Sequence, residues 1–405
     1  TICRISEEAF NRPGTLRYTV EDIPVEMCSH LVLGGFFRYT ETGELDTSDS
    51  DDHLTPKCIV NALKEKYPHL KILLEIGEVY NGASFARLIN SADTRERFVN
   101  SVLKWVRRYD LDGVSVFWDA YNATDVTPDA KRDLHNRFSL NRSHAGAASN
   151  TGYIACYFTG SIHLIRAHIL PAFSRLVDLF QAFTALLRRT ILGQTGMHTQ
   201  LFPSFRDKGS SRRLNLDSIV RMLKDAGVPD QKIVVTLSFA GRLFMLLDKD
   251  KHEVLAPTNP DYDKEKVSTP PFYKVSFHIV PTQICRSQIL DGWPSAWDSV
   301  TASPYTYDDE CWVSYDDEAS LRTKVDWAIL QNLAGVFVWS VDQDDYRADC
   351  HGHTYALMRV IYKMTCLGCL PVPPERECKE CKEWDVLDCT GQNCSYHFHE
   401  TECSR

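Results

Sequence analysis

The chain has no long hydrophobic run, no excess of positive charge and no nucleotide-binding signature. Its most apolar stretch, residues 176–187, is short and contains Asp178, so we expect no membrane-spanning helix. The 405 residues include 54 acidic and 45 basic side chains, a net charge of −9, which argues against a nucleic-acid partner. Neither a G-x-G-x-x-G nor a P-loop sequence occurs, so no cofactor is expected.

The first residues also lack the features of a signal peptide. Residue 1 is Thr, and no charged segment followed by an apolar one comes after it. We therefore expect a mature chain from which a secretory signal has been removed. Three Asn-x-Ser/Thr sequons, at Asn122, Asn141 and Asn393, are compatible with a secreted, extracellular glycoprotein.

Cysteine, by contrast, is abundant and unevenly distributed. Seven of the 14 cysteines are scattered before residue 366, and seven crowd the tail: Cys366, Cys369, Cys378, Cys381, Cys389, Cys394 and Cys403. The tail has almost no aliphatic residues for a core, so we expect it to be cross-linked. The spacing of its first four cysteines also resembles a zinc knuckle, but export favours disulfides, and no metal site is expected. Because seven is odd, either one bridge joins body to tail or each half keeps a free thiol.

Helix and strand signals alternate along the body, which is typical of a parallel sheet with crossover helices. Four such cycles suggest either a doubly wound sheet or an eightfold barrel, and the missing nucleotide motifs favour the barrel. Residues 245–315 are rich in Tyr, Trp, Pro and Asp and predict a small inserted β-rich lobe, while residues 122–150 read as a surface connection. The predicted elements are a helix from Thr55-Pro56 to Pro68, strand 71–77, a helix from Asp93 to near Tyr109, strand 113–119, a helix from Leu216 to Gly227, strand 232–239, a helix with the stripe Leu321, Val325, Ala328 and Ile329, and strand 336–341.

A series of short segments then appears in a specific order. They are Cys3, Tyr18-Thr-Val-Glu-Asp-Ile, Met27-Cys-Ser-His-Leu, Leu70-Lys-Ile-Leu-Leu-Glu-Ile-Gly, Arg97-Phe-Val-Asn-Ser-Val, Asp112-Gly113 with Trp118, Gly241-Arg242, Trp312-Val-Ser-Tyr-Asp-Asp, Val338-Trp339 with Asp344-Asp345, and Cys350. In order and spacing, the chain resembles the family 18 glycoside hydrolases, which include chitinases and chitinase-like lectins. The resemblance implies an α/β fold, a (β/α)8 TIM barrel over residues 1–363, with an α+β lobe inserted after the seventh strand and a cysteine-rich tail at 364–405. It also implies disulfides between Cys3 and Cys28 and between Cys285 and Cys350.

The family's catalytic motif is altered in this chain. Family enzymes use Asp-Gly-x-Asp-x-Asp-Trp-Glu on the fourth strand, where a glutamic acid protonates the glycosidic oxygen and the sugar's acetamido group attacks the anomeric carbon. Ser115 and Phe117 replace the two inward aspartates, and Asp119 replaces the glutamate with a carboxyl one methylene shorter. A misplacement of about 1 Å can already cost about a hundredfold in rate. We therefore predict a protein without chitinase activity.

The sugar groove implied by the resemblance is reduced as well. Arg4, Gly35, Val79 and Ala240 stand where the family has aromatic residues, and the sixth-strand segment is Phe183-Thr-Ala-Leu. Only Trp339, the floor of the family's sugar site, survives; Trp118 and Arg242 are the other candidate ligand-binding residues. Trp339 has a second interpretation as a filler of the barrel, and Arg242 as the partner of an acidic neighbour.

These observations lead to three functional hypotheses. The first is a secreted, inactive chitinase-like protein that binds chitin or N-acetylglucosamine oligomers. The second is a protein-interaction scaffold that uses its tail and has no glycan ligand. The third is a weak chitinase with Asp119 as the general acid.

Overall fold

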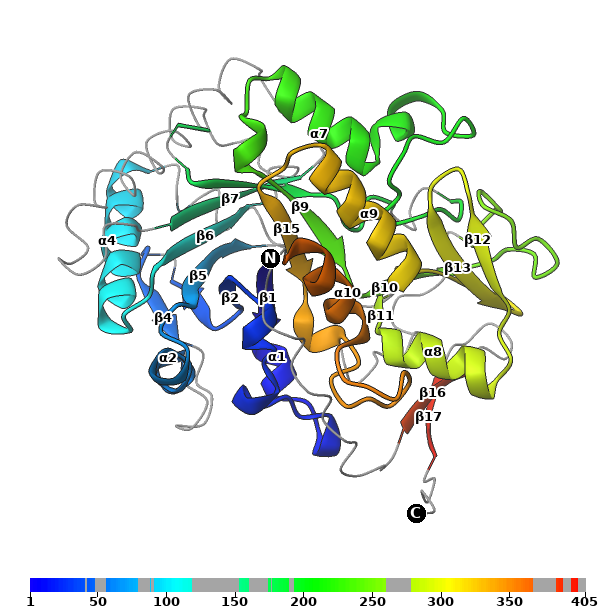
Figure 1. The fold of residues 1–405 in the computed structure, drawn as a ribbon, viewed down its shortest axis with the longest axis horizontal. Helices are drawn as coiled ribbons and strands as arrows, with labels where there is room; N and C mark the ends of the chain where they lie inside the picture. Colours follow the sequence, from blue (N-terminus) through cyan, green and yellow to red (C-terminus); the bar gives the residue numbers. More distant parts are fainter. Residues whose placement is uncertain are drawn as a thin grey trace.

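The computed structural model describes residues 1–40, 42–47, 56–78, 88, 91–118, 153–159, 174–175, 177–188, 193–259, 278–366, 384–388 and 395–399. Eight parallel strands form a closed barrel (Figure 1), with neighbours in the order β1-β15-β9-β8-β7-β6-β5-β2. The barrel fold is confirmed, and the doubly wound sheet is excluded. The strands are β1 (Ile2–Ser6), β2 (His30–Gly34), β5 (Lys71–Glu78), β6 (Gly113–Trp118), β7 (Tyr153–Thr159), β8 (Leu179–Phe183), β9 (Ile233–Ser238) and β15 (Gly335–Trp339).

Amphipathic helices pack on the outside of this barrel. Their buried stripes face outward-pointing strand residues in one large apolar core, as the periodicity of the sequence predicts. The described α-helices are α1 (Glu7–Phe10), α2 (Pro56–Lys66), α4 (Ala92–Arg108), α7 (Leu216–Asp225), α8 (Pro281–Leu290), α9 (Glu318–Leu330) and α10 (Ala356–Thr365). Short 3-10 helices lie at Gly14–Leu16, Val20–Asp22, Val25–Met27, Gly209–Arg213, Asp230–Lys232 and Val341–Gln343.

Two details of the predicted helices were wrong. The helix that was predicted to begin at Asp93 is α4, which begins at Ala92 and is capped by the side chain of Ser91, the acceptor of a hydrogen bond from the backbone N–H of Thr94. Ile329 was placed in the buried stripe of α9 but is 52% exposed. Helix α9 begins in the same way: the side chain of Asp317 accepts a hydrogen bond from the backbone N–H of Ser320 and so caps the helix.

The predicted inserted lobe is present between the seventh and eighth barrel strands. It is a five-stranded antiparallel sheet in the order β11-β10-β14-β13-β12, which lies to one side of the barrel in Figure 1. Helix α8 covers it, and Ile284 of α8 packs with Leu243, Cys311 and Val313 in a separate small core. The strands are β10 (Gly241–Met245), β11 (His278–Ile279), β12 (Ser295–Asp298), β13 (Ser303–Asp308) and β14 (Cys311–Ser314).

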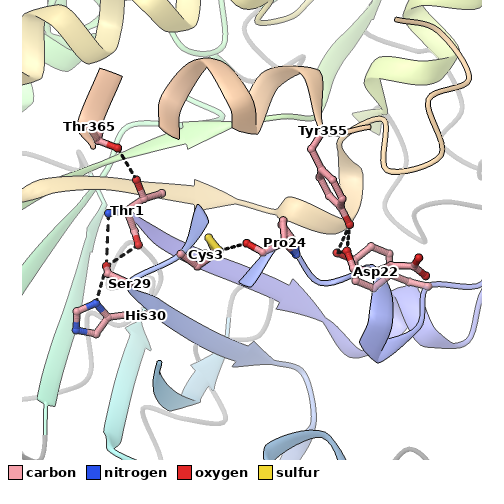
Figure 2. The surroundings of a disulfide bond; sticks show 10 residues. Thr1, Cys3, Asp22, Pro24, Ser29, His30, Tyr355 and Thr365 are labelled. Atoms are coloured by element: carbon pink, nitrogen blue, oxygen red, sulfur yellow. Dashed lines mark hydrogen bonds between the residues drawn. A yellow bond between two sulfur atoms is a disulfide. The ribbon is translucent and has the colours of Figure 1, made fainter. Parts of the chain in front are cut away.

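Two disulfides join distant parts of the body in the pairs that the resemblance implied. Cys3 of β1 bonds to Cys28, with a Cα–Cα distance of 5.8 Å, beside the hydrogen bonds of Thr1 with Ser29 and Thr365 (Figure 2). Cys285 of α8 bonds to Cys350 in the loop before α10, with a Cα–Cα distance of 6.2 Å. The first bond fixes the start of the barrel, and the second ties the inserted lobe to it.

Two further hairpins complete the described structure. One, β3 (Phe37–Tyr39) with β4 (Leu45–Thr47), lies after the second barrel strand. The other, β16 (Trp384–Asp388) with β17 (Ser395–His399), belongs to the tail and lies beside α8 (Figure 1). Among the helices that the structure describes, none is long and apolar enough to cross a membrane.

Candidate functional site

The degenerate catalytic motif lies on β6, and its alternating residues enter the barrel. Successive side chains of a strand point to opposite faces, so Ser115 and Phe117 both face inward while Val114 and Val116 join the outer core. Ser115 is fully buried, and its hydroxyl has no hydrogen-bond partner among the described residues. Phe117 is 1% exposed. The two positions where the family carries aspartates therefore hold an unengaged hydroxyl and a core phenyl ring.

The last two residues of this motif fall outside what the structure describes in side-chain detail. Trp118 is the last residue of β6, and only its backbone is described. Asp119, the candidate acid, lies outside the described residues, as do Val79 and the sequons at 122, 141 and 393. Their roles remain predictions.

Trp339, the candidate floor of a sugar site, is covered by other side chains. It ends β15 and is 3% exposed. Its ring centroid lies 5.2 Å from that of Phe117 and 5.5 Å from that of Phe183, the latter edge-on. The guanidinium carbon of Arg4 lies 4.1 Å from the same ring. The aromatic face that would receive a sugar is therefore in contact with protein groups.

Arg4 is held in this position by a buried ion pair inside the barrel. Its Nε and Nη2 each donate a hydrogen bond of 2.8 Å to a different carboxylate oxygen of Glu75 on β5. The two side chains are 7% and 9% exposed. Such a two-point contact fixes the plane of the guanidinium as well as its place.

A glycine makes room for this ion pair. Strand β2 lies between β1 and β5, and Gly34 is its last residue. A Cβ atom at Gly34 would lie 2.3 Å from the guanidinium carbon of Arg4, closer than any real contact. The missing side chain at residue 34 is therefore what lets Arg4 reach Glu75.

The segment that follows Trp339 is anchored by a second buried ion pair. Asp342 accepts a hydrogen bond of 2.6 Å from Nη2 of Arg12 and one of 3.2 Å from the backbone N–H of Ser6. Nη1 of Arg12 also donates to the backbone carbonyl of Asp342, at 2.8 Å. These contacts tie the segment after β15, close in sequence to Trp339, to the end of β1 and to Arg12.

Two further polar residues lie on the inserted lobe and in the loop before α10. Arg242 lies on β10, partly buried, with its backbone opposite Ser314 of β14. His351 pairs with Asp345 at 3.2 Å, and this hydrogen bond raises the pKa of His351. Among the described residues, no group of three or more His, Cys, Asp or Glu side chains could hold a metal ion.

One buried polar cluster between the barrel and the lobe was not predicted from the sequence. His198 is fully buried; its Nε2 donates to the carbonyl of Ala240 at 2.9 Å, and its Nδ1 lies 2.6 Å from the hydroxyl of Ser314. Burial lowers the pKa of His198 to about 4. Neighbouring Asp316 accepts hydrogen bonds from Thr199 and the buried Lys324. Because every member has a partner, we assign this cluster to joining the lobe and the barrel.

A hollow of about 380 Å³ also lies outside the barrel. It is lined by α8, by the start of α9 and by His351, and it borders the Cys285–Cys350 disulfide. Its walls are partly acidic, through Asp317 and Glu318. Trp339 is not part of this hollow, so it gives no access to the candidate sugar site.

Comparison with known proteins places the chain among chitinases and their relatives. The model of the glycosyl hydrolases family 18 matches residues 1–344. An endochitinase of Manduca sexta is 25% identical over 392 residues, which cover 95% of this chain and 70% of the relative. Human chitinase-3-like protein 2 is 25% identical over 376 residues, covering 89% of this chain and 91% of the relative.

Solved structures share the fold at lower identity. The crystal structure of an immunomodulatory active chitinase from Trichuris suis superposes with a TM-score of 0.81 at 20% identity, covering 90% of this chain and 99% of that one. Human YKL-39, described as a pseudo-chitinase with retained chitooligosaccharide binding properties, superposes with a TM-score of 0.79 at 23% identity, covering 90% and 98%. Active and inactive proteins thus share this barrel.

Proposed function

Because the chain belongs to the glycosyl hydrolases family 18 but has a covered Trp339, we propose that it is a catalytically inactive chitinase-like protein that acts by binding a partner. The observation that carries this proposal is the packing of Arg4, Phe117 and Phe183 on the Trp339 ring. We further propose that the barrel centre is a packed core and that the partner, a protein, binds elsewhere on the surface.

The chemistry of the barrel centre supports the loss of catalysis. Hydrolysis in this family needs a positioned acid and a carboxylate that orients the acetamido group. Ser115 and Phe117 supply neither, and a shortened Asp119 would have to act alone. Rates depend on placing reacting groups within about 1 Å. We therefore propose that Asp119 is a remnant of the site and not a general acid.

The ion pair of Arg4 with Glu75 supports the loss of sugar binding. A sugar ring stacked on Trp339 would have to displace the guanidinium, which lies 4.1 Å from the indole. Displacing the guanidinium would break its ion pair with Glu75, whose side chain is only 9% exposed. Breaking such a buried pair typically costs about 3–5 kcal/mol. That cost is comparable to the whole binding energy of a millimolar ligand, about 4 kcal/mol.

Chitooligosaccharide binding is the second candidate function. It is favoured by the presence of Trp339 at the end of the eighth strand, and YKL-39 is described as retaining such binding. Under this alternative the sugar would uncover Trp339, or would bind without it. The covered ring is the reason for ranking this candidate second.

We also propose that the protein is secreted. Two disulfides, Cys3–Cys28 and Cys285–Cys350, lie in the body, and Cys311 and Cys366 are disulfide-bonded as well. Cys366 was part of the zinc-knuckle alternative, and its bond favours cross-linking of the tail. Disulfides at this density persist in oxidising compartments.

Titration calorimetry with chitohexaose tests the binding half of the proposal. The wild-type protein is expected to give no saturable heat up to millimolar sugar, while a chitooligosaccharide-binding relative gives heat under the same conditions. Saturable binding that is weakened by Trp339→Ala would refute a closed barrel centre and support the second candidate. The folding of the variant is checked by circular dichroism.

A further inference from the structure

Cys311 forms a disulfide that neither of the two pairs in the body explains. It is the first residue of β14 in the inserted lobe, is fully buried, and is disulfide-bonded. Cys3 and Cys28 bond to each other, as do Cys285 and Cys350. The partner of Cys311 must therefore be one of the remaining cysteines.

The other cysteines of the body are in the wrong place. A disulfide requires Cα atoms within about 7 Å of each other. Cys58 lies on α2 and Cys156 on β7, and Figure 1 shows both elements well separated from β10 and β13, the strands that flank β14. Position alone excludes both.

Cys366 is excluded by its own surroundings. It follows α10, next to Thr365, whose hydroxyl lies 3.0 Å from that of Thr1 at the start of the first barrel strand (Figure 2). The N-terminus marked in Figure 1 lies among the barrel strands and away from the inserted sheet. The cysteines left after this elimination all belong to the tail: Cys369, Cys378, Cys381, Cys389, Cys394 and Cys403.

A strand of the tail lies close to the inserted lobe, which contains Cys311. Strand β16 lies beside α8, below the inserted sheet in Figure 1. Ile284 of α8 packs in the same small core as Cys311. Strand β16, a described part of the tail, thus lies next to the helix that covers the lobe core containing Cys311.

We propose that Cys311 is bonded to a tail cysteine after Cys366, so that the tail is covalently fixed to the inserted lobe. In forming the bond, two thiols lose two protons and two electrons to a disulfide of an oxidoreductase in the secretory compartment, which becomes a dithiol. The bridge would join the lobe and the tail covalently. The body and the tail each contain seven cysteines, and of the two explanations for these odd numbers the proposal favours a bridge between body and tail over a free thiol in each half. It is independent of the proposed function.

Peptide mapping without reduction tests this bond. The purified full chain is alkylated, digested with trypsin and analysed by mass spectrometry. Peptide 287–322 contains Cys311 as its only cysteine, and trypsin divides the tail cysteines among peptides 364–376, 377–379, 380–382 and 383–405. We expect peptide 287–322 joined to one of these four. If the linked peptide is 364–376, fragmentation should place the bond on Cys369, and a bond on Cys366 would contradict the proposal. The control is the linked pair of peptides 275–286 and 348–359, which reports Cys285–Cys350 in the same digest.

Two results would overturn the proposal. One is peptide 287–322 alkylated at Cys311 while the control pair is intact, and the other is its linkage to peptide 58–64 or 143–166, which contain Cys58 and Cys156. A variant provides a test that does not depend on recovering the linked peptides. In Cys311→Ser, we expect one tail cysteine to become alkylated while the Cys285–Cys350 control pair persists. An unchanged alkylation pattern in the tail would contradict the bond.

Discussion

The guanidinium of Arg4 lies 4.1 Å from the ring of Trp339, the residue that the family resemblance predicts as the floor of a sugar site. The contact is a cation–π interaction, which is stronger in a desolvated site than on a surface. Glu75 orients the guanidinium from the opposite side with two hydrogen bonds of 2.8 Å. The barrel centre thus contains its own set of matched contacts, and the first two of the three predictions below follow from them.

The first prediction concerns the buried ion pair. Arg4→Met or Glu75→Leu alone leaves an unpaired charge in the barrel, and each should lower the free energy of unfolding by about 3–5 kcal/mol. The double variant Arg4→Met/Glu75→Leu removes both charges and should recover most of that loss. Urea unfolding of the four proteins measures the cycle. Additive losses in the double variant would show that the two residues do not act as a pair.

The second prediction concerns the phenyl ring of Phe117, at a position where the family resemblance predicts an inward aspartate. Phe117→Ala should lower the free energy of unfolding by about 3–5 kcal/mol, because it leaves a cavity against Trp339 and Phe183. Phe205→Ala is the matched control: Phe205 is 76% exposed, and its loss should cost less than about 0.5 kcal/mol. Equal effects of the two variants in urea unfolding would mean that Phe117 is not a core residue.

The third prediction concerns the pH dependence of stability. Burial lowers the pKa of His198 to about 4, and the hydroxyl of Ser314 donates to the neutral ring. The stability from a neutral His198 is therefore complete above the unfolded pKa of 6.5 and is lost as pH falls from 6.5 to 4. The linked loss is about 3 kcal/mol, from about 1.4 kcal/mol per pKa unit.

The variant His198→Gln should flatten this part of the stability profile. Urea unfolding between pH 7 and 4 measures the slope, and the exposed His69→Gln is the control, for which we expect the wild-type slope. A slope in His198→Gln equal to that of the wild type would show that protonation of His198 does not limit stability in acid.

Much of the fold was predictable because local and global signals agree. The stripe Phe98, Val99, Val102, Leu103 and Val106 is buried as a helical period requires. The inserted lobe was recognisable because residues 245–315 lacked a helical period and were too long for a loop. The errors, at Ser91 and Ile329, lie at a helix end and at a position whose exposure depends on neighbours far away in the sequence.

The site was only partly predictable. The loss of inward carboxylates at Ser115 and Phe117 follows from strand alternation, which needs no tertiary knowledge. The partnership of Arg4 with Glu75 was missed because the two are 71 residues apart, although a glutamate inside the apolar strand Lys71–Glu78 was a usable signal. Trp339 had two interpretations, as the floor of a sugar site or as a residue that fills the barrel. The choice between them depends on the pairing of Arg4 with Glu75, which no pattern along the chain reveals.

The most direct test is hydrolysis of a fluorogenic chitobioside by the purified wild-type protein, beside an active family 18 chitinase at equal concentration. With no carboxyl at residue 115 or 117, we predict no release above the buffer rate, where the active enzyme gives a clear signal. Turnover by the wild type that disappears in Asp119→Ala, with folding intact, would contradict the account and establish the protein as an enzyme.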